Sequence, residues 1–279
     1  MSATRLLALA WLGAAAAFAP VGRRVRLAPL RATAAVDNAP AVDSLFAAIE
    51  RFRAAEASDG VGYVDNFGVK GGELDKDTRA PSNLMDSWSP PVRAAADEVV
   101  SCIDALAAVN PTPDATALLG TAEGARCPLD GAWANVWTTA ADASFSPNST
   151  RGDASVFNVV DAAKGRVTNV IDFVPGPNAK LSQFRVSLAA TALTRARVGL
   201  RFRLVRARLA KPLLFGLIKQ ITIPVPGPFI TRILTLLRRG PKDGPPPAYF
   251  DVLYLDANLR IHKTGQGNLF VQRRPEWTR

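Results

Sequence analysis

The sequence predicts a mainly β protein with helices at its N-terminal side, in which the strands form an antiparallel barrel. Two apolar stripes at helical spacing lie before residue 110. From residue 128 the chain changes to short runs of alternating apolar and polar residues separated by turn residues. The clearest run, TRARVGLRFRL, places arginines on one side and apolar residues on the other. One-sided, meandering strands of this kind favour a barrel slightly over a sandwich.

Residues 1–36 are predicted to be a targeting segment. Arg5 precedes the apolar run LLALAWLGAAAA, which is too short to span a bilayer and is typical of a signal-peptide core. Phe18 follows, and then an arginine-bearing segment without acids reaches Val36. This order resembles the bipartite presequences of algae whose plastids came from a eukaryotic endosymbiont. A plain secretory signal with a basic propeptide is the alternative.

Residues 37–125 are predicted to hold two helices and the loops around them. Leu45, Ile49 and Phe52 are spaced for one face of the first helix, with Asp43 or Ser44 as its cap. A loop rich in glycine and aspartate spans about 59–83, and no function is evident for it.

The second helix is predicted from about Pro91 to Val109. Its apolar stripe is Val99, Ile103 and Leu106. The run NPTPDAT ends it, because two prolines cannot continue a helix.

Residues 126–275 are predicted to form the barrel. The strand-like runs before the arginine-rich strand are GAWANVWTT, SVFNVVD, RVTNVIDFV and QFRVSLAAT. In the arginine-rich strand, the alternation slips by one residue at Arg206 and Arg208, which indicates a bulge near Val205. The last runs are AYFDVLYLD, LRIHK and NLFVQRR, with a turn at 256–258 and a second turn at Gly265 and Gly267.

Charge is distributed very unevenly along the chain. Residues 1–36 carry five basic residues and no acid, residues 37–173 carry ten basic and twenty acidic residues, and residues 174–242 carry fourteen basic residues and no acid. Such polarity suits an anionic partner. A membrane surface fits, and a solvated basic sheet face is the plain alternative. Motifs of nucleic-acid readers are missing from the sequence, so we expect no nucleic-acid partner.

The stretch 229–237 has an apolar stripe at helical spacing that includes Phe229 and Ile233, with arginines beside it. A short basic amphipathic helix of this kind can lie in a bilayer interface. It can equally close the mouth of a barrel, and the sequence does not decide between the two.

Catalytic and metal chemistry find little support in the sequence. Cys102 and Cys127 lack the spacing of a metal site, and His262 is the only histidine. Two reduced thiols are expected, with a single disulfide as the open alternative. No Ser-His-Asp set can be built around His262, so we expect no enzyme, no cofactor and no metal.

Several motifs resemble the plastid lipid-associated proteins, or fibrillins. From about Val99 to Arg274 the runs VNPTPDAT, LDGAWANVWTT, GRVTNVIDF, IPVPGPF and YLDANLRIHKTGQGNLFV follow the order of that family. The resemblance implies a lipocalin-like antiparallel barrel. The family-motif positions are Gly131, Trp133, Asp256, Arg260, Gly267, Asn268 and Phe270. His262 with Lys263, and also Gln272, depart from the family pattern.

The resemblance implies non-enzymatic work on lipids such as carotenoids and prenylquinones, at plastoglobules or thylakoids or in the stroma. The alternative is a soluble stromal module that assists an enzyme of prenylquinone synthesis. We expect the lipid cavity to be lined by Trp137, Phe157, Phe173, Phe202, Leu204 and Tyr254. We expect an anionic plastid membrane to be met by Arg201, Arg203, Arg206, Arg208, Phe229 and Ile233.

Overall fold

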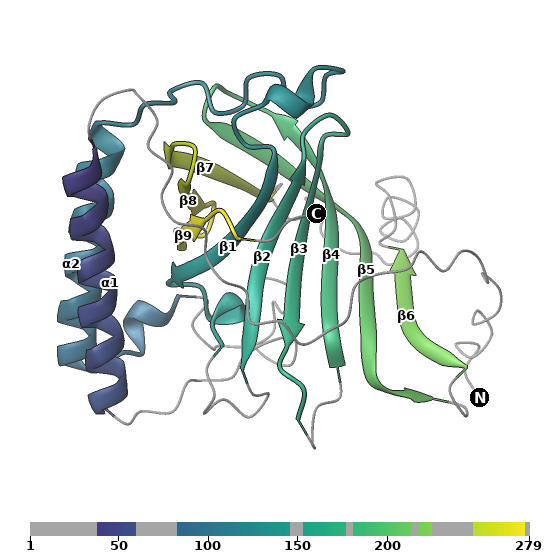
Figure 1. The fold of residues 1–279 in the computed structure, drawn as a ribbon, viewed down its shortest axis with the longest axis horizontal. Coiled ribbons are helices and arrows are strands. Elements are labelled where there is room, and N and C mark those ends of the chain that lie inside the picture. The colour runs from purple at the N-terminus through teal and green to yellow at the C-terminus, as the bar shows by residue number, and fades with distance from the viewer. Residues whose placement is uncertain are drawn as a thin grey trace, which may run out of the picture.

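Two helices pack against one face of a nine-stranded antiparallel sheet that closes into a ring (Figure 1). The computed structural model describes residues 38–59, 83–145, 153–176, 181–213, 217–224 and 248–276. This architecture confirms the predicted mainly β fold with N-terminal helices. The targeting segment, most of the 59–83 loop and the 229–237 stretch lie outside the described residues.

Helices α1 (Ala39–Asp59) and α2 (Pro90–Ala108) carry the two predicted apolar stripes. The predicted faces are confirmed, since Leu45, Ile49 and Ile103 are fully buried. The predicted cap of α1 at Asp43 or Ser44 is wrong, because the helix begins at Ala39. Proline is well suited to the first turn of a helix, where its missing N–H costs no bond, so Pro40 lets α1 start earlier than the apolar stripe indicates.

The sheet follows the order β4-β3-β2-β1-β9-β8-β7-β5-β6, and an additional β4–β5 pairing closes the ring. All strand pairs are antiparallel. The strands are β1 Gly131–Thr138, β2 Ala154–Asp161, β3 Arg166–Phe173, β4 Leu181–Ala192, β5 Arg197–Leu213, β6 Ile218–Pro224, β7 Ala248–Leu255, β8 Leu259–Thr264 and β9 Leu269–Arg273.

The helices cover the outer face of β7, β8 and β9. Tyr254, Ile261 and Val271 from these strands are buried in one apolar cluster with the stripes of α1 and α2. Residues that alternate with them in the strands, such as Arg260 and Gln272, therefore face the inside of the ring. Packing of two helices on one arc of the ring thus fixes which side of each strand is the interior.

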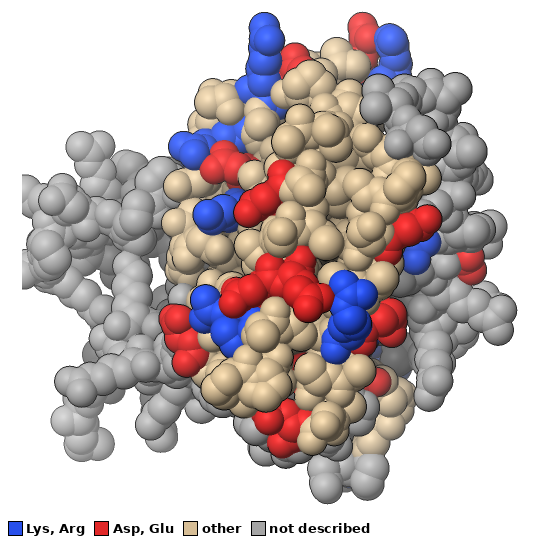
Figure 2. Space-filling view, turned by 90° about the vertical axis from the view of Figure 1, so that its left-hand side faces the viewer, with Lys and Arg blue, Asp and Glu red and all other residues tan. Residues whose placement is uncertain are grey.

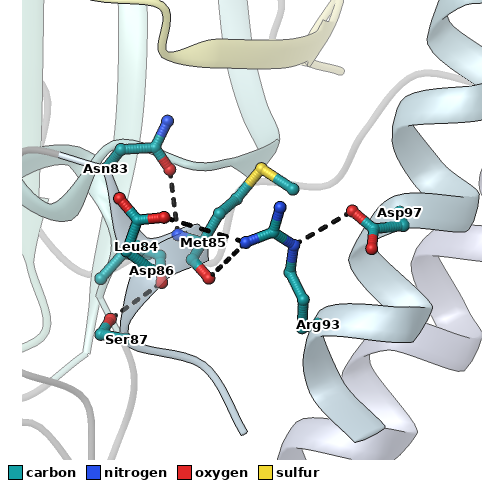
Figure 3. A network of polar contacts seen from close by, with 7 residues as sticks. All are labelled: Asn83, Leu84, Met85, Asp86, Ser87, Arg93 and Asp97. Atoms are coloured by element: carbon teal, nitrogen blue, oxygen red, sulfur yellow. Dashed lines mark hydrogen bonds and ion pairs between the residues drawn. The ribbon is translucent and has the colours of Figure 1, made fainter. Parts of the chain in front are cut away.

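A polar network fastens the start of α2 to the segment before it (Figure 3). The Arg93 guanidinium donates to the Met85 carbonyl at 2.9 Å and to Asp97 Oδ1 at 3.1 Å, and it lies 3.9 Å from Asp86 Oδ1. The Asn83 side chain accepts from the Met85 N–H at 2.9 Å and caps the short 3-10 helix Leu84–Asp86. The Leu84 N–H in turn donates to the Thr139 carbonyl, which links this segment to the end of β1.

Strand β5 is 17 residues long and extends beyond the ring. Its first residues, 197–200, pair with β7, and its later residues pair with β6 on the same edge. The β4–β5 register shifts between Phe202 and Leu204, so Arg203 is the extra residue of a bulge. The sequence indicates a bulge near Val205, two residues away from its place in the structure.

The segment 111–130 closes one end of the ring. The Gly120 N–H donates to the Ala162 carbonyl in the β2–β3 turn, and the Thr116 N–H donates to the Arg195 carbonyl in the β4–β5 turn. Ala115, Leu119, Cys127 and Leu129 of this segment are buried in one cluster with inward-facing strand residues. Figure 1 shows the segment crossing the upper end of the strands.

Candidate functional site

The inner face of the ring is aromatic and apolar near its closed end. Trp133 and Phe250 lie there, 0% and 5% exposed. They share a buried cluster with Val160, Val167, Ala190, Val198 and Val252. These residues come from strands on opposite sides of the ring, so the closed sheet has a packed core at this end.

Trp133 is the centre of that packing. Its indole N–H donates to the Leu129 carbonyl at 2.9 Å, within the segment that closes the ring. The Arg274 guanidinium carbon lies 3.7 Å from the centre of the Trp133 ring. Arg274 also donates to the carbonyls of Pro128 and Asp130. One tryptophan and one arginine thereby hold the closing segment, β1 and the end of β9 together.

Arg260 lies inside the ring and is 1% exposed. Its Nε donates to Gln272 Oε1 at 2.8 Å, and its Nη2 donates to Asn158 Oδ1 at 2.6 Å. Gln272 Nε2 donates to the same Asn158 oxygen at 2.7 Å, and Asn158 Nδ2 donates to Asn169 Oδ1 at 2.8 Å. The interior therefore contains a chain of neutral amides that orients one guanidinium.

Burial changes the acid-base behaviour of the interior cations. Burial, with a smaller contribution from Arg274, lowers the pKa of Arg260 to about 9. Burial, and then the nearby Arg260, holds the pKa of His262 well below its ordinary value. His262 is stacked on Phe270, with ring centres 4.8 Å apart and planes 3° apart. At neutral pH the interior thus holds a charged Arg260 and a neutral His262.

The six residues expected to line the cavity do not share one surface. Trp137 and Tyr254 lie in the helix cluster on the outer face of the ring. Phe157 is 1% exposed and packs with Ala134 and Val170, which alternate with the inward-facing residues of their strands. The structure brings only part of this expected set to the interior.

Phe173 and Phe202 are the expected cavity residues on the inner face. Phe202 lies opposite the buried Leu188. Leu204 lies beyond the bulge, opposite Ser187, on the face that Arg206 shares. The expected inward direction of Leu204 is therefore wrong, since the extra residue at Arg203 reverses the alternation of the strand.

The family-motif residues at the two last turns hold backbone geometry. Asp256 Oδ1 accepts from the N–H groups of Asn258 and Leu259, each at 2.7 Å, which forms the β7–β8 turn. Gly267 has φ +87°, a conformation that glycine adopts without strain, in the β8–β9 turn. Asn268 follows it and is 1% exposed, with Thr139 beside its side chain. These positions shape turns.

The outer face of β4, β5 and β6 is basic, and these three strands carry eight basic residues and no acid. The exposed arginines on it are Arg201, Arg203, Arg206 and Arg208. The helix face differs, because α1 and α2 carry seven acidic and three basic residues. Figure 2 shows acidic and basic side chains intermixed on that helix face. The described part of the molecule is therefore polarised between two sides.

A groove of about 380 Å³ lies where β5 and β6 extend past the ring. Arg208, Lys211 and Lys219 line it together with Leu181 and Leu209. Exposed apolar side chains lie close by on the edge strand β6, where Ile221 is 42% and Ile223 57% exposed. Basic and apolar groups thus occur together at this end of the sheet.

Sequence reasoning did not identify the interior polar chain. Asn158 and Asn169 occupy inward positions of the runs SVFNVVD and RVTNVIDF, where the alternation calls for apolar residues. Their polar character at those positions is the signal that could have found them. No feature of the sequence marks Arg274 in the same way. Its contact with Trp133 forms only because β9, which ends just before Arg274, pairs with β1 in the folded chain.

The two cysteines are free thiols, Cys127 buried and Cys102 half-buried. Within the described ranges, the helices are too short or too polar to cross a membrane. In a comparison with known protein families, a family model described as PAP_fibrillin matches residues 91–273. No curated protein and no solved structure matches the chain.

Proposed function

Because this chain belongs to the PAP/fibrillin family, we propose that it is a non-enzymatic plastid protein that binds or coats lipids at an anionic membrane surface. Family membership implies a plastid lipid-associated protein. Carotenoids, prenylquinones and the lipids of plastoglobules or thylakoids are the ligands that the proposal includes. The observation that carries the membrane contact is the projecting end of β5 and β6, where exposed basic and apolar side chains occur together.

The two sides of this projection suit different parts of a membrane. Arg206 and Arg208 lie on its outer side, opposite Thr222 and Gln220 of β6. Ile221 and Ile223 lie on the other side, opposite Ala207 and Val205. Guanidinium groups attract anionic head groups. Transfer of exposed isoleucine side chains from water to the acyl boundary is favourable, because apolar surface leaves water.

The charge distribution orients the protein in the proposal. In this orientation the exposed Arg201, Arg203, Arg206 and Arg208 of β5 face the membrane, while the helix pair with its seven acids faces away. A field of this polarity favours approach of the basic side to an anionic surface. The groove lined by Arg208, Lys211 and Lys219 then offers a place for an anionic head group.

Binding to vesicles that contain sulfolipid tests the proposal. Each arginine that reaches the surface contributes about 1 kcal/mol, so Arg206→Gln/Arg208→Gln is expected to lower the affinity about thirtyfold at low salt. Raising the ionic strength screens the same attraction. Ile223→Asp is expected to remove the salt-resistant part of binding, because that part depends on apolar insertion. Co-sedimentation at low and high salt measures both parts.

Arg51→Gln/Arg126→Gln is the matched control, since it removes the same charge from exposed positions away from β5 and β6. We expect it to bind vesicles like the wild type. An equal loss in both double variants would mean that total charge, rather than this surface, attracts the protein. If the wild type fails to bind even at low salt, the membrane contact is wrong and a soluble stromal binding module becomes the better account.

Plastid targeting through the N-terminal segment is a separate part of the proposal. Replacing Phe18 with alanine in a fluorescent fusion of the full chain is expected to divert the protein to a compartment associated with the endoplasmic reticulum. The expectation depends on the order of apolar run, Phe18 and basic segment. Val21→Ala is the control in the same segment. Microscopy that finds both fusions in the plastid would contradict the bipartite interpretation.

A further inference from the structure

The buried guanidinium of Arg260 has no counter-ion in the described part of the chain. Its hydrogen-bond partners are the neutral amides of Gln272 and Asn158. The charged group that most affects it is another cation, Arg274. Burying a charge without a partner of opposite sign costs several kcal/mol, and hydrogen bonds to amides offset only part of that cost. The buried and unpaired guanidinium of Arg260 is therefore suited to binding the anionic group of a ligand.

Three buried side-chain atoms in this region have no hydrogen-bond partner among the described residues. Two are Arg260 Nη1 and His262 Nδ1, and the third is the acceptor Oδ1 of Asn135, which pairs with Gln272 across β1 and β9. The guanidinium carbon of Arg260 lies 5.2 Å from the Trp133 ring centre and 5.8 Å from the Phe250 ring centre. Aromatic faces stabilise a cation weakly and accept no strong hydrogen bond. The free Nη1 therefore still has the capacity to donate to an acceptor oxygen.

The interior beyond Arg260 becomes apolar. Along β3, Val167 lies near the closed end of the ring, and Asn169, Ile171 and Phe173 follow on the same face. Four residues of strand span about 13 Å, so this apolar lining continues about that far from the amide chain toward the other end. Phe202 of β5 lies opposite Leu188 on the same inner surface. Polar recognition at one end and apolar lining at the other suit a long-chain amphiphile.

We propose that Arg260 and His262 form an interior site for the carboxylate of a long-chain fatty acid. The carboxylate accepts from Arg260 Nη1 and approaches His262 Nδ1, and the acyl chain lies along Ile171, Phe173 and Phe202. Gln272 and Asn158 position the guanidinium by holding its other nitrogens. The site deepens the proposed lipid function and rests on it, but it is separate from the membrane contact on the outer face of β5 and β6.

Oleate and methyl oleate distinguish a carboxylate site from a merely apolar interior, because they share the acyl chain and differ in charge. We expect the purified, delipidated full chain to bind oleate at least tenfold more tightly than methyl oleate, measured by displacement of a fluorescent fatty acid. Gln272→Glu places a carboxylate beside Arg260 and is expected to reduce that preference to below threefold, with methyl oleate affinity unchanged. Its thermal midpoint is expected to stay the same or rise, since the buried cation gains a partner.

Gln220→Glu is the matched control, the same chemical change on the exposed strand β6, and it is expected to keep the tenfold preference. Arg260→Gln is also expected to lose the preference for oleate over methyl oleate. The test does not depend on whether Arg260→Gln folds, because Gln272→Glu probes the same site. Equal binding of oleate and methyl oleate by the wild type would overturn the carboxylate site and leave the lipid function standing. An equal loss of both ligands in Gln272→Glu would reduce Arg260 to a structural role. If the wild type binds neither lipid in solution nor anionic vesicles, both proposals fail.

Discussion

Trp133→Ala is expected to lower the free energy of unfolding by about 3–5 kcal/mol, the range for removing a large buried aromatic side chain. Trp133 is fully buried inside the ring. The substitution removes the ring that Arg274 covers and the donor to the Leu129 carbonyl. Segment 111–130 and the end of β9 then lose a shared contact. Urea unfolding followed by circular dichroism measures the change.

Trp88→Ala is the matched control, because Trp88 is half-buried in the helix cluster, with its ring centre 4.9 Å from that of Phe52. It is expected to cost about 1–2 kcal/mol, since less apolar surface is lost. Trp133→Phe is expected to recover most of the stability, because an aromatic ring remains beside Arg274 and near Arg260. Equal losses in Trp133→Ala and Trp88→Ala would contradict the central role of Trp133.

Gly124→Ala is expected to cost about 3 kcal/mol or more, since overpacking against atoms that cannot rotate away is at the upper end of its usual range. A Cβ at Gly124 would lie 2.3 Å from the Ala163 nitrogen and 2.5 Å from the Ala162 carbonyl carbon. Both are backbone atoms next to the β2–β3 turn, so the closing segment must move away from the ring. Thermal unfolding measures the loss, and near-ultraviolet circular dichroism reports the environment of Trp133.

Gly120→Ala is the control within the same segment. Gly120 has φ +79°, and no atom lies within 4 Å of the added Cβ. Its cost is the backbone strain of an alanine in the left-handed region, about 1–2 kcal/mol. If the two variants lose the same stability, the close approach of residues 124 and 162–163 is not what holds the segment in place.

Local pattern was sufficient for most elements of the fold. The stripes of α1 and α2 and the alternation of the strands depend on residues three, four or two positions apart, and those spacings are visible in the sequence. The same reasoning missed the start of α1 at Ala39, because the first turn of that helix precedes its apolar stripe. It also misplaced the bulge of β5 by two residues, which reversed the direction of Leu204.

The amides of Asn158 and Gln272 show where local reasoning ends. In the sequence they are isolated polar residues in apolar strands, and Gln272 is only a departure from the family pattern. In the ring they meet Arg260, which is 102 residues from Asn158 along the chain. The expected cavity residues Trp137 and Tyr254 show the reverse case. Their aromatic character is evident, but the helices that cover them decide that they lie on the outer face.

The helices, the strand alternation, the turn glycines and the family can all be predicted from the amino-acid order, because each depends on neighbouring residues or on the order of motifs. The pairing of β4 with β5 that closes the ring, the interior face of each strand, and the burial of Arg260 without a counter-ion among the described residues become evident only in the folded chain. The reason is that burial and electrostatic pairing depend on residues brought together from distant strands. No local spacing encodes those distances, since they arise only when the sheet closes and the helices pack on one side of it.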